Sequence, residues 1–367
     1  MGTLIYYEMK KIVAQKKNSW AMLAFVICIL VFIVANIRLE NNAEEMQMNE
    51  LYFEISDANQ MINAASTAEN ASALNVDYYT EKSRVLNELL TAYQNGDRHG
   101  ELVLENELDT LILSNETLSE NEIASLNEEL DINQILLEKG IEPENTQYSM
   151  QSYQFIRLVN GGMMPFLMLL LILLVSSDVV SEEIETGTYK ALFTQPVKRT
   201  NLLIAKSIAQ TGFFLLFFLL IFSVFFFGLG VFRGFGVVDY PVLIYSGEYI
   251  GIGQLILTML PLMVLNLMAA VSFSVLCSVL FDSGTASISA AMIVMTLLYL
   301  ISSKMMLFRS IAGYNPLMYW NVPAVLYGTY SDIGVFYQTG LVVMPIVIVI
   351  CYVSAFLVFK KKTVNVY

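Results

Sequence analysis

Charged residues are scarce in this sequence. Asp, Glu, Lys and Arg together make up 14% of its 367 residues, whereas hydrophobic residues make up 56%. An ordinary soluble domain has about 25% charged residues. The deficit is uneven, because several stretches of 19 or more residues contain none of the four. This composition excludes a soluble enzyme as the main interpretation and predicts a polytopic helical membrane protein.

Histidine, cysteine and nucleotide-binding motifs are also nearly missing. His99 is the single histidine, and Cys28, Cys277 and Cys351 all lie in apolar stretches. We therefore expect no metal site and no disulfide framework. The dipeptide Gly-Lys never occurs, which excludes a P-loop, and neither HExxH nor GxSxG is present. We expect no catalytic residue, no cofactor and no enzymatic activity on this chain.

The negative charge is confined to one region. The segment 39–154 contains 24 Asp/Glu and 4 Lys/Arg, a net charge of −20, whereas the rest of the chain has 9 acids and 16 bases, a net charge of +7. A segment this acidic repels phosphate backbones, so we expect no nucleic acid partner. An acidic polar insert of 116 residues thus interrupts an apolar, mildly basic body.

Six apolar stretches are long enough to cross a bilayer as helices. They cover residues 19–37, 155–180, 203–231, 250–281, 285–303 and 341–359. Before them, residues 1–18 predict an amphipathic helix on the membrane face. Its apolar residues recur at helical spacing, whereas Glu8, Lys11 and Gln15 fall elsewhere; the apolar set is Leu4, Ile5, Met9, Ile12 and Val13. The alternative is a plain basic flank before the first span.

Basic residues predict the orientation. Six spans place both termini on one side, and 11 of the 20 bases gather there: Lys10, Lys11, Lys16, Lys17, Lys190, Lys198, Arg199, Lys206, Lys360, Lys361 and Lys362. The positive-inside rule makes that side cytoplasmic. The insert, 39–154, is then extracellular.

The insert has helical patterns of its own. Residues 79–93 and 102–113 place leucines on one side, and Ser119 with Glu122 forms a capping box before a third apolar pattern that ends at Gly140. We expect a small helical domain on stalks that continue spans one and two. The fold class is therefore all-α: the transmembrane helix 19–38, the extracellular helical domain 39–154, and spans two to six within 155–367.

The source of energy must lie outside the spans. Their interiors contain no Asp, Glu, Lys or Arg, which argues against a proton-driven transporter and against an ion pathway. A partner ATPase on the cytoplasmic side is the simplest source. The segment 178–206 could bind such an ATPase, because its acidic turn, Gly-Thr break and Pro-Val-Lys-Arg turn predict a charged helical hairpin. The alternative is an ordinary polar loop.

This segment resembles the one between the second and third spans of type-2 ABC transporter permeases, as do the six-span plan and the N-terminal helix. The resemblance implies a nucleotide-binding partner that holds ATP and Mg²⁺, contacted through Glu182, Glu183, Glu185, Gly187, Thr188, Leu192, Phe193, Pro196, Lys198 and Arg199. It also implies a second permease subunit, identical or related. Spans two and five would then line the shared pathway, with Met163, Met164, Phe166, Met168, Met292 and Met295 as candidates.

Three functions remain open at this point. The first is the permease subunit of an ABC exporter in a bacterial plasma membrane that moves an amphiphilic or apolar cargo such as a peptide, an antimicrobial compound or a lipid-like molecule. The second is an ion-extrusion permease, which the uncharged span interiors disfavour. The third is a non-transporting sensor or scaffold whose acidic outer domain binds a cationic peptide or another partner.

Overall fold

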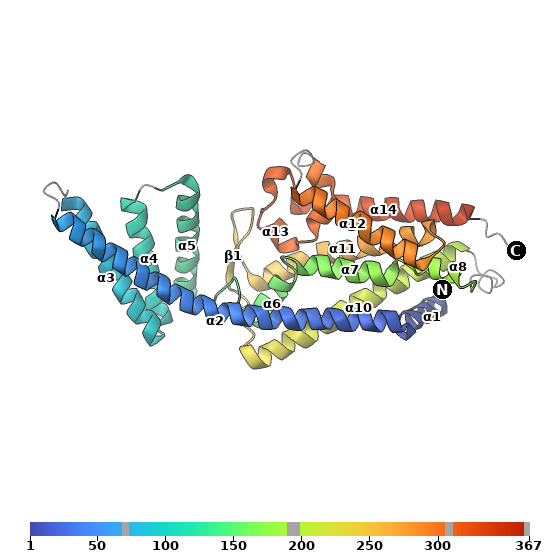
Figure 1. The fold of residues 1–367 in the computed structure, drawn as a ribbon, viewed down its shortest axis with the longest axis horizontal. Helices are drawn as coiled ribbons and strands as arrows, with labels where there is room; N and C mark the ends of the chain where they lie inside the picture. Colours follow the sequence, from blue (N-terminus) through green and yellow to red (C-terminus); the bar gives the residue numbers. More distant parts are fainter. Residues whose placement is uncertain (68–72, 117, 189–198, 305–310, 363–367) are drawn as a thin grey trace.

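The computed structural model describes residues 1–67, 73–116, 118–188, 199–304 and 311–362. A helical bundle forms one end of the elongated molecule and a separate group of helices, the insert, forms the other (Figure 1). The described helices and strands are α1 Gly2–Ala14, α2 Lys16–Thr67, α3 Ala73–Asn95, α4 Arg98–Asn115, α5 Glu120–Lys139, α6 Ser152–Val159, α7 Met164–Ser176, α8 Ser181–Glu185, α10 Arg199–Arg233, β1 Pro241–Leu243, β2 Tyr249–Gly251, α11 Ile252–Leu280, α12 Gly284–Lys304, η2 Pro316–Tyr319, α13 Val322–Leu326, η3 Ser331–Ile333 and α14 Tyr337–Lys361.

Within the residues that the structure describes, six helical stretches are long and apolar enough to cross a membrane, which agrees with the predicted number of spans. The second of them, Met164–Glu185, comprises α7, α8 and the turn between them. Helices α10, α11, α12 and α14 match the predicted spans three to six to within a few residues. In span four, the predicted first residue, Ile250, belongs to β2, which pairs antiparallel with β1. This short hairpin was not predicted.

Span two differs from the prediction. The expected continuous helix 155–180 is divided into α6 and α7 by the residues Asn160-Gly161-Gly162, and α7 ends at Ser176. Gly162 has a φ of 57°, a left-handed conformation that glycine adopts without steric cost. Pro165 lies in the first turn of α7, where its missing N–H is not needed. The apolar run therefore contains a turn that hydropathy alone does not reveal.

Span one continues without a break into the insert. Helix α2 has 52 residues and no glycine or proline, so nothing in its sequence interrupts the helix. At 1.5 Å per residue it is about 78 Å long. Its far half packs on α3, where Leu51 and Ile55 contact a core made by Val85, Leu86, Leu89 and Leu108. Helix α2 thus extends span one into the insert as predicted, whereas residues 141–151, which lead into span two, contain no helix and form no such stalk.

The remaining helices of the insert agree with their local signals. Ser119 and Glu122 form the predicted capping box of α5, and Gly140 ends that helix with a φ of 62°. A second small core joins the insert to the bundle, because Leu102 and Leu136 pack against Tyr240 and Ile252 beside the hairpin. The insert is thus attached to the bundle through α2 and through this contact.

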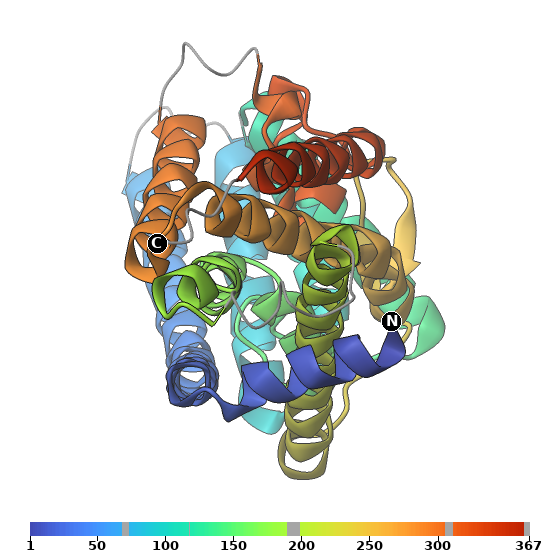
Figure 2. The same ribbon diagram turned by 90° about the vertical axis from the view of Figure 1, so that its right-hand side faces the viewer.

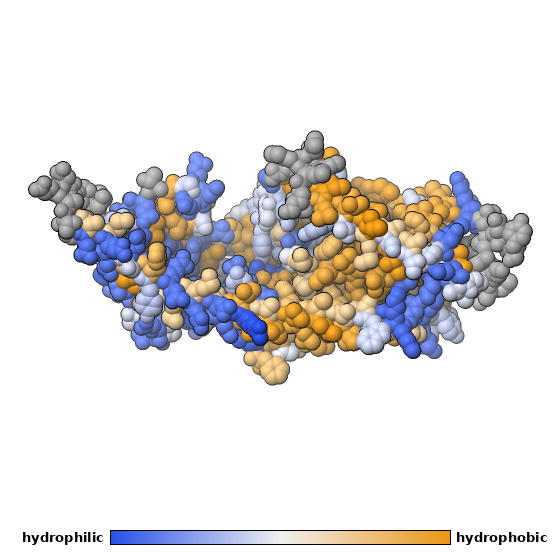
Figure 3. Space-filling model, in the orientation of Figure 1, coloured by the Kyte–Doolittle hydropathy of each residue, from blue (hydrophilic) through white to orange (hydrophobic). Residues whose placement is uncertain are grey.

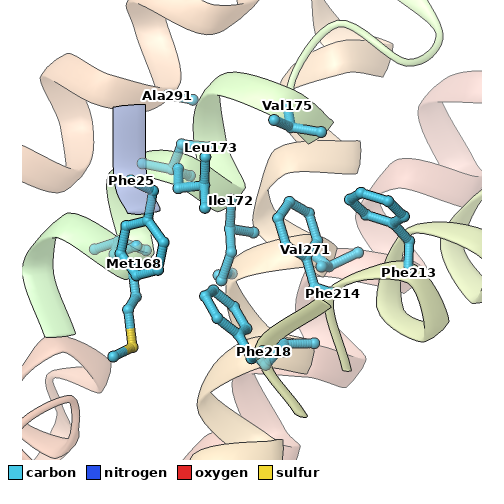
Figure 4. Close-up of a cluster of buried hydrophobic side chains, with 14 of the residues drawn as sticks. Phe25, Met168, Ile172, Leu173, Val175, Phe213, Phe214, Phe218, Val271 and Ala291 are labelled. Atoms are coloured by element: carbon cyan, nitrogen blue, oxygen red, sulfur yellow. The ribbon is translucent and has the colours of Figure 1, made fainter. Parts of the chain in front are cut away.

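Helices α7 and α11 form the interior of the bundle, and α2, α10, α12 and α14 present apolar side chains to its surroundings. Phe25, Met168, Ile172 and Phe214 meet in the main core (Figure 4). In the space-filling view, hydrophobic residues cover the middle of the bundle, and hydrophilic residues cover both its α1 end and the insert (Figure 3). This pattern is that of a multi-pass membrane protein.

Candidate functional site

Helix α1 lies across the end of the bundle, where it contacts α10 and α2 (Figure 2). Ile12 is buried, and Ile5 and Met9 pack against the main core. Leu4 is half-buried, whereas Val13 is exposed. Glu8, expected on the polar outer side, is 7% exposed. One polar stripe of α1 therefore faces the protein.

A cluster of two acids and two bases explains why that stripe is buried. Lys206 of α10 is only 1% exposed, and its Nζ lies 3.0 and 2.9 Å from the two carboxylate oxygens of Glu8. The same Nζ lies 2.6 Å from Oε1 of Glu183 in α8, and Lys11 donates to that oxygen at 2.6 Å. Removing charges from water is costly unless they are paired, and these four pair in alternation.

Lys11 is charged in this arrangement. Burial by itself lowers the pKa of its ammonium group, but the charge of Glu183 and the hydrogen bond to it outweigh burial and raise the pKa above the ordinary value. The cluster thus connects α1, α8 and α10 through charged hydrogen bonds, which are stronger than neutral ones.

The junction between α1 and α2 contacts α8 and the turn that precedes it. Gln15 donates to Oε2 of Glu182 at 2.6 Å, and Lys17 forms an ion pair with Asp178. Asn18 is buried and donates to the carbonyl of Ile12 at 2.9 Å, which fixes the turn between the two helices. The start of span one is therefore bound to the turn that follows span two.

Spans four and five hold α8 from its other side. Ser278 Oγ of α11 accepts from the N–H groups of Val180 and Ser181 at 2.7 and 3.0 Å, so it satisfies donors at the start of α8. Glu185 Oε2 accepts from the N–H of Gly284, the first residue of α12, at 2.7 Å. Residues 177–188 overlap the hairpin 178–206, which the resemblance predicts to couple to a partner, and we name them the coupling segment after that prediction. They contact α1, α2, α10, α11 and α12.

Span six reaches the same end of the bundle. Lys362 lies 2.7 Å from Oδ1 of Asp282 in the α11–α12 turn, and it donates to the carbonyl of Val279 at 2.8 Å. Span two leads directly into the coupling segment, and spans one, three, four and five contact it. Span six contacts the α11–α12 turn, which lies next to the coupling segment.

The structure places the predicted contact residues on two sides of α8. Glu183 is buried and Glu182 half-buried, so both face the protein, whereas Glu185 and Thr188 are exposed. Gly187 has a φ of 73° and turns the chain after α8. Arg199 is the first residue of α10. Leu192, Phe193, Pro196 and Lys198, together with Lys190, lie outside the described residues.

The candidate pathway residues do not form one surface. Met164, Met168 and Met295 are buried in the main core of the single chain. Phe166 and Met292 are half-buried, and the Phe166 ring stacks on Tyr299 at 4.9 Å. Met163 is 72% exposed at the start of α7. Met164 and Met168 lie on α7, which other helices enclose, and Met295 lies on α12. That these residues line a pathway stays a prediction.

Sequence reasoning missed the partners of the coupling segment. Lys206 was counted only as a basic residue of one face, and Glu8 only as part of a polar side. One signal was available: Lys206 is the fourth residue of the predicted span 203–231, at the end of its apolar run, and a charge at that position needs a partner. Ser278 carried no signal, because a serine within an apolar helix usually bonds its own backbone.

The described part of the chain contains no group of three or more His, Cys, Asp or Glu side chains that could hold a metal ion. Six helical stretches in the described part of the chain are long and apolar enough to cross a membrane, and a charged short helix joins them at one end, an arrangement that fits a multi-pass membrane protein. Residues 3–364 match the family model described as ABC-2 family transporter protein, and the chain belongs to that family. No curated protein and no solved structure matches the chain.

Proposed function

We propose that this chain is the permease subunit of an ATP-driven exporter. A separate nucleotide-binding subunit would hydrolyse ATP and bind the coupling segment on the cytoplasmic side. The observation that carries this proposal is the buried ionic cluster of Glu8, Lys11, Glu183 and Lys206, because it joins the coupling segment to helix α1 and to span three, which are far apart in sequence. Membership of the ABC-2 family supports an ATPase partner.

The two faces of α8 would have different tasks. Glu183 faces the bundle and positions α8, so it is not itself a contact for the partner. The exposed residues Glu185, Thr186 and Thr188 are available to a partner from the described part of the segment. A displacement of α8 would act at once on α10 through Lys206 and on α11 through Ser278. A rigid-body movement of the partner can thus reach the spans.

The cargo would be amphiphilic or apolar, and it would move outward across a bacterial plasma membrane. Both termini would be cytoplasmic and the insert extracellular, as the basic residues at the α1 end indicate. A second permease subunit, identical or related, would complete the pathway. Apolar side chains exposed on α12, among them Ile293 and Leu297, would be available to that interface.

Co-purification tests the proposed contact. The chain is expressed with the soluble P-loop protein encoded beside it, and the complex is isolated through a tag on the chain. Thr188→Arg places a bulky charge at the exposed end of the coupling segment, in the turn after α8, and is expected to abolish the complex. Glu120→Arg on the insert is the matched control. A complex of full strength with Thr188→Arg, or equal loss in the control, would contradict the proposal.

A further inference from the structure

The half of α2 that leaves the bundle has an apolar stripe without cover. Leu39, Met46 and Phe53 are 45%, 68% and 75% exposed and lie seven residues apart, so they share one side of the helix. Leu51 and Ile55, on the other side, pack toward α3. This half of α2 leaves the bundle and runs along the insert, against α3 (Figure 1). The stripe therefore faces away from the insert core.

Lipid does not cover the whole stripe. The apolar run of span one ends near Ile37, and Phe53 lies 16 residues further along the same unbroken helix. At 1.5 Å per residue this places Phe53 about 24 Å beyond the end of the apolar run. Met46 and Phe53 are thus in water, where exposed apolar surface is unfavourable.

Acidic residues share the stripe. Glu50 and Asp57 follow Met46 and Phe53 by four residues, which places them on the same side, and both are exposed. Residues 39–81 contain nine Asp/Glu and no Lys or Arg. The basic residues of the neighbouring helices do not neutralise this side, because Lys82, Arg84 and Arg98 form ion pairs with acids of α3 and α4 or of the turn after α4.

This charge pattern indicates which kind of partner could cover the stripe. Two copies of the stripe would bring like charges together, which disfavours pairing with a second copy of this chain. A helix with apolar residues on one side and Lys or Arg beside them complements both components of the stripe. We propose that the stripe of Leu39, Met46, Glu50, Phe53 and Asp57 is a docking surface for a cationic amphipathic peptide.

Binding of such a peptide requires neither nucleotide nor a partner subunit, so its test is independent of the proposed exporter function. The full chain is placed in nanodiscs of uncharged phosphatidylcholine, which removes electrostatic binding to lipid. The probe is a fluorescent Leu/Lys amphipathic peptide, and its affinity is measured by anisotropy at low and high salt. A Leu/Glu peptide of the same pattern and an oligolysine serve as comparison probes.

The variants separate the apolar and acidic contributions. Phe53→Ser and Met46→Ser are each expected to weaken binding about ten-fold, as for residues central to an interface. Glu50→Lys is expected to weaken binding similarly and to reduce its dependence on salt. Val103→Ser, at a position 44% exposed on α4, is the matched control and should leave affinity unchanged. All four side chains are in contact with solvent, so the fold should be retained.

Four results would overturn the proposal. The Leu/Glu peptide could bind as tightly as the Leu/Lys peptide, which would show that only apolar contact matters. Oligolysine could bind as tightly, which would show that only charge matters. Loss of affinity in Val103→Ser equal to that in Phe53→Ser would place the contact elsewhere. Finally, the chain could bind no peptide but self-associate, and Phe53→Ser could abolish that self-association. The stripe would then be an interface between copies of the chain.

Discussion

Replacing Lys206 by methionine tests whether the ionic cluster holds the spans together. The substitution keeps an unbranched side chain of similar length but removes the charge. Glu8 would then lack the ammonium group that contacts both its oxygens, and Glu183 would retain only Lys11. Because Lys206 and Glu8 are 1% and 7% exposed, water cannot replace the lost partner without opening the site.

The expected loss of stability is large. Removing one partner of a buried ion pair costs about 3–5 kcal/mol, because the remaining charge is left buried. For a chain of this size, that loss corresponds to a fall of roughly 4–7 °C in Tm. The double variant Lys206→Met/Glu8→Gln leaves Lys11 paired with Glu183 and no unpaired charge, so it should recover most of the loss.

The assay is thermal unfolding of the detergent-solubilised chain, followed by intrinsic fluorescence. Lys82→Met is the matched control, because Lys82 pairs with Glu116 at a partly exposed site on the insert. An exposed pair contributes only about 0–1 kcal/mol. A Tm for Lys206→Met equal to that of the wild type, or a double variant less stable than Lys206→Met, would refute the reasoning.

Three further predictions concern the insert, the coupling segment and the topology. Burial and the nearby Glu129 raise the pKa of Asp109 to about 7, so stability should fall as pH rises from about 4 to about 7 and then level off; Asp109→Asn should flatten that decline in pH-dependent melting curves. Ser278→Ala leaves two buried N–H groups without an acceptor and should lower stability by about 1–3 kcal/mol, whereas Ser274→Ala, which loses only a bond to its own helix, should be nearly neutral in the same melts. In a cysteine-free background, a membrane-impermeant maleimide added outside cells should label Ile123→Cys and not Thr186→Cys; the reverse pattern would invert the topology.

The features that the sequence predicted correctly depend on local patterns. Uninterrupted apolar runs specified the six spans, and Ser119, Glu122 and Gly140 specified both ends of α5. The division of span two also had a local signal, the Asn160-Gly161-Gly162 turn, which hydropathy averaged over a long window conceals. The outer position of the insert follows from charge bias and remains a prediction.

The ionic cluster could not be predicted, because its members are distant in sequence. Glu8 and Lys206 are separated by 198 positions, and Ser278 lies 97 positions from Ser181. Nothing in the local pattern of α1 shows that Glu8 faces inward, since an acid on an amphipathic helix normally faces water. Packing of the spans alone brings these groups together. The sequence indicated the segment, and the fold supplied its partners.

The length of helix α2 and its lack of a hinge have a mechanical consequence. One end of it is fixed to the coupling segment by Lys17 and Asp178, and the other supports the insert. Because no glycine or proline gives it a hinge, a tilt of about 5° at its base would carry its tip through roughly 7 Å over its length. Such a lever would let an event at the α1 end of the bundle open or close contacts at the far end of the insert, without any pore having to form first.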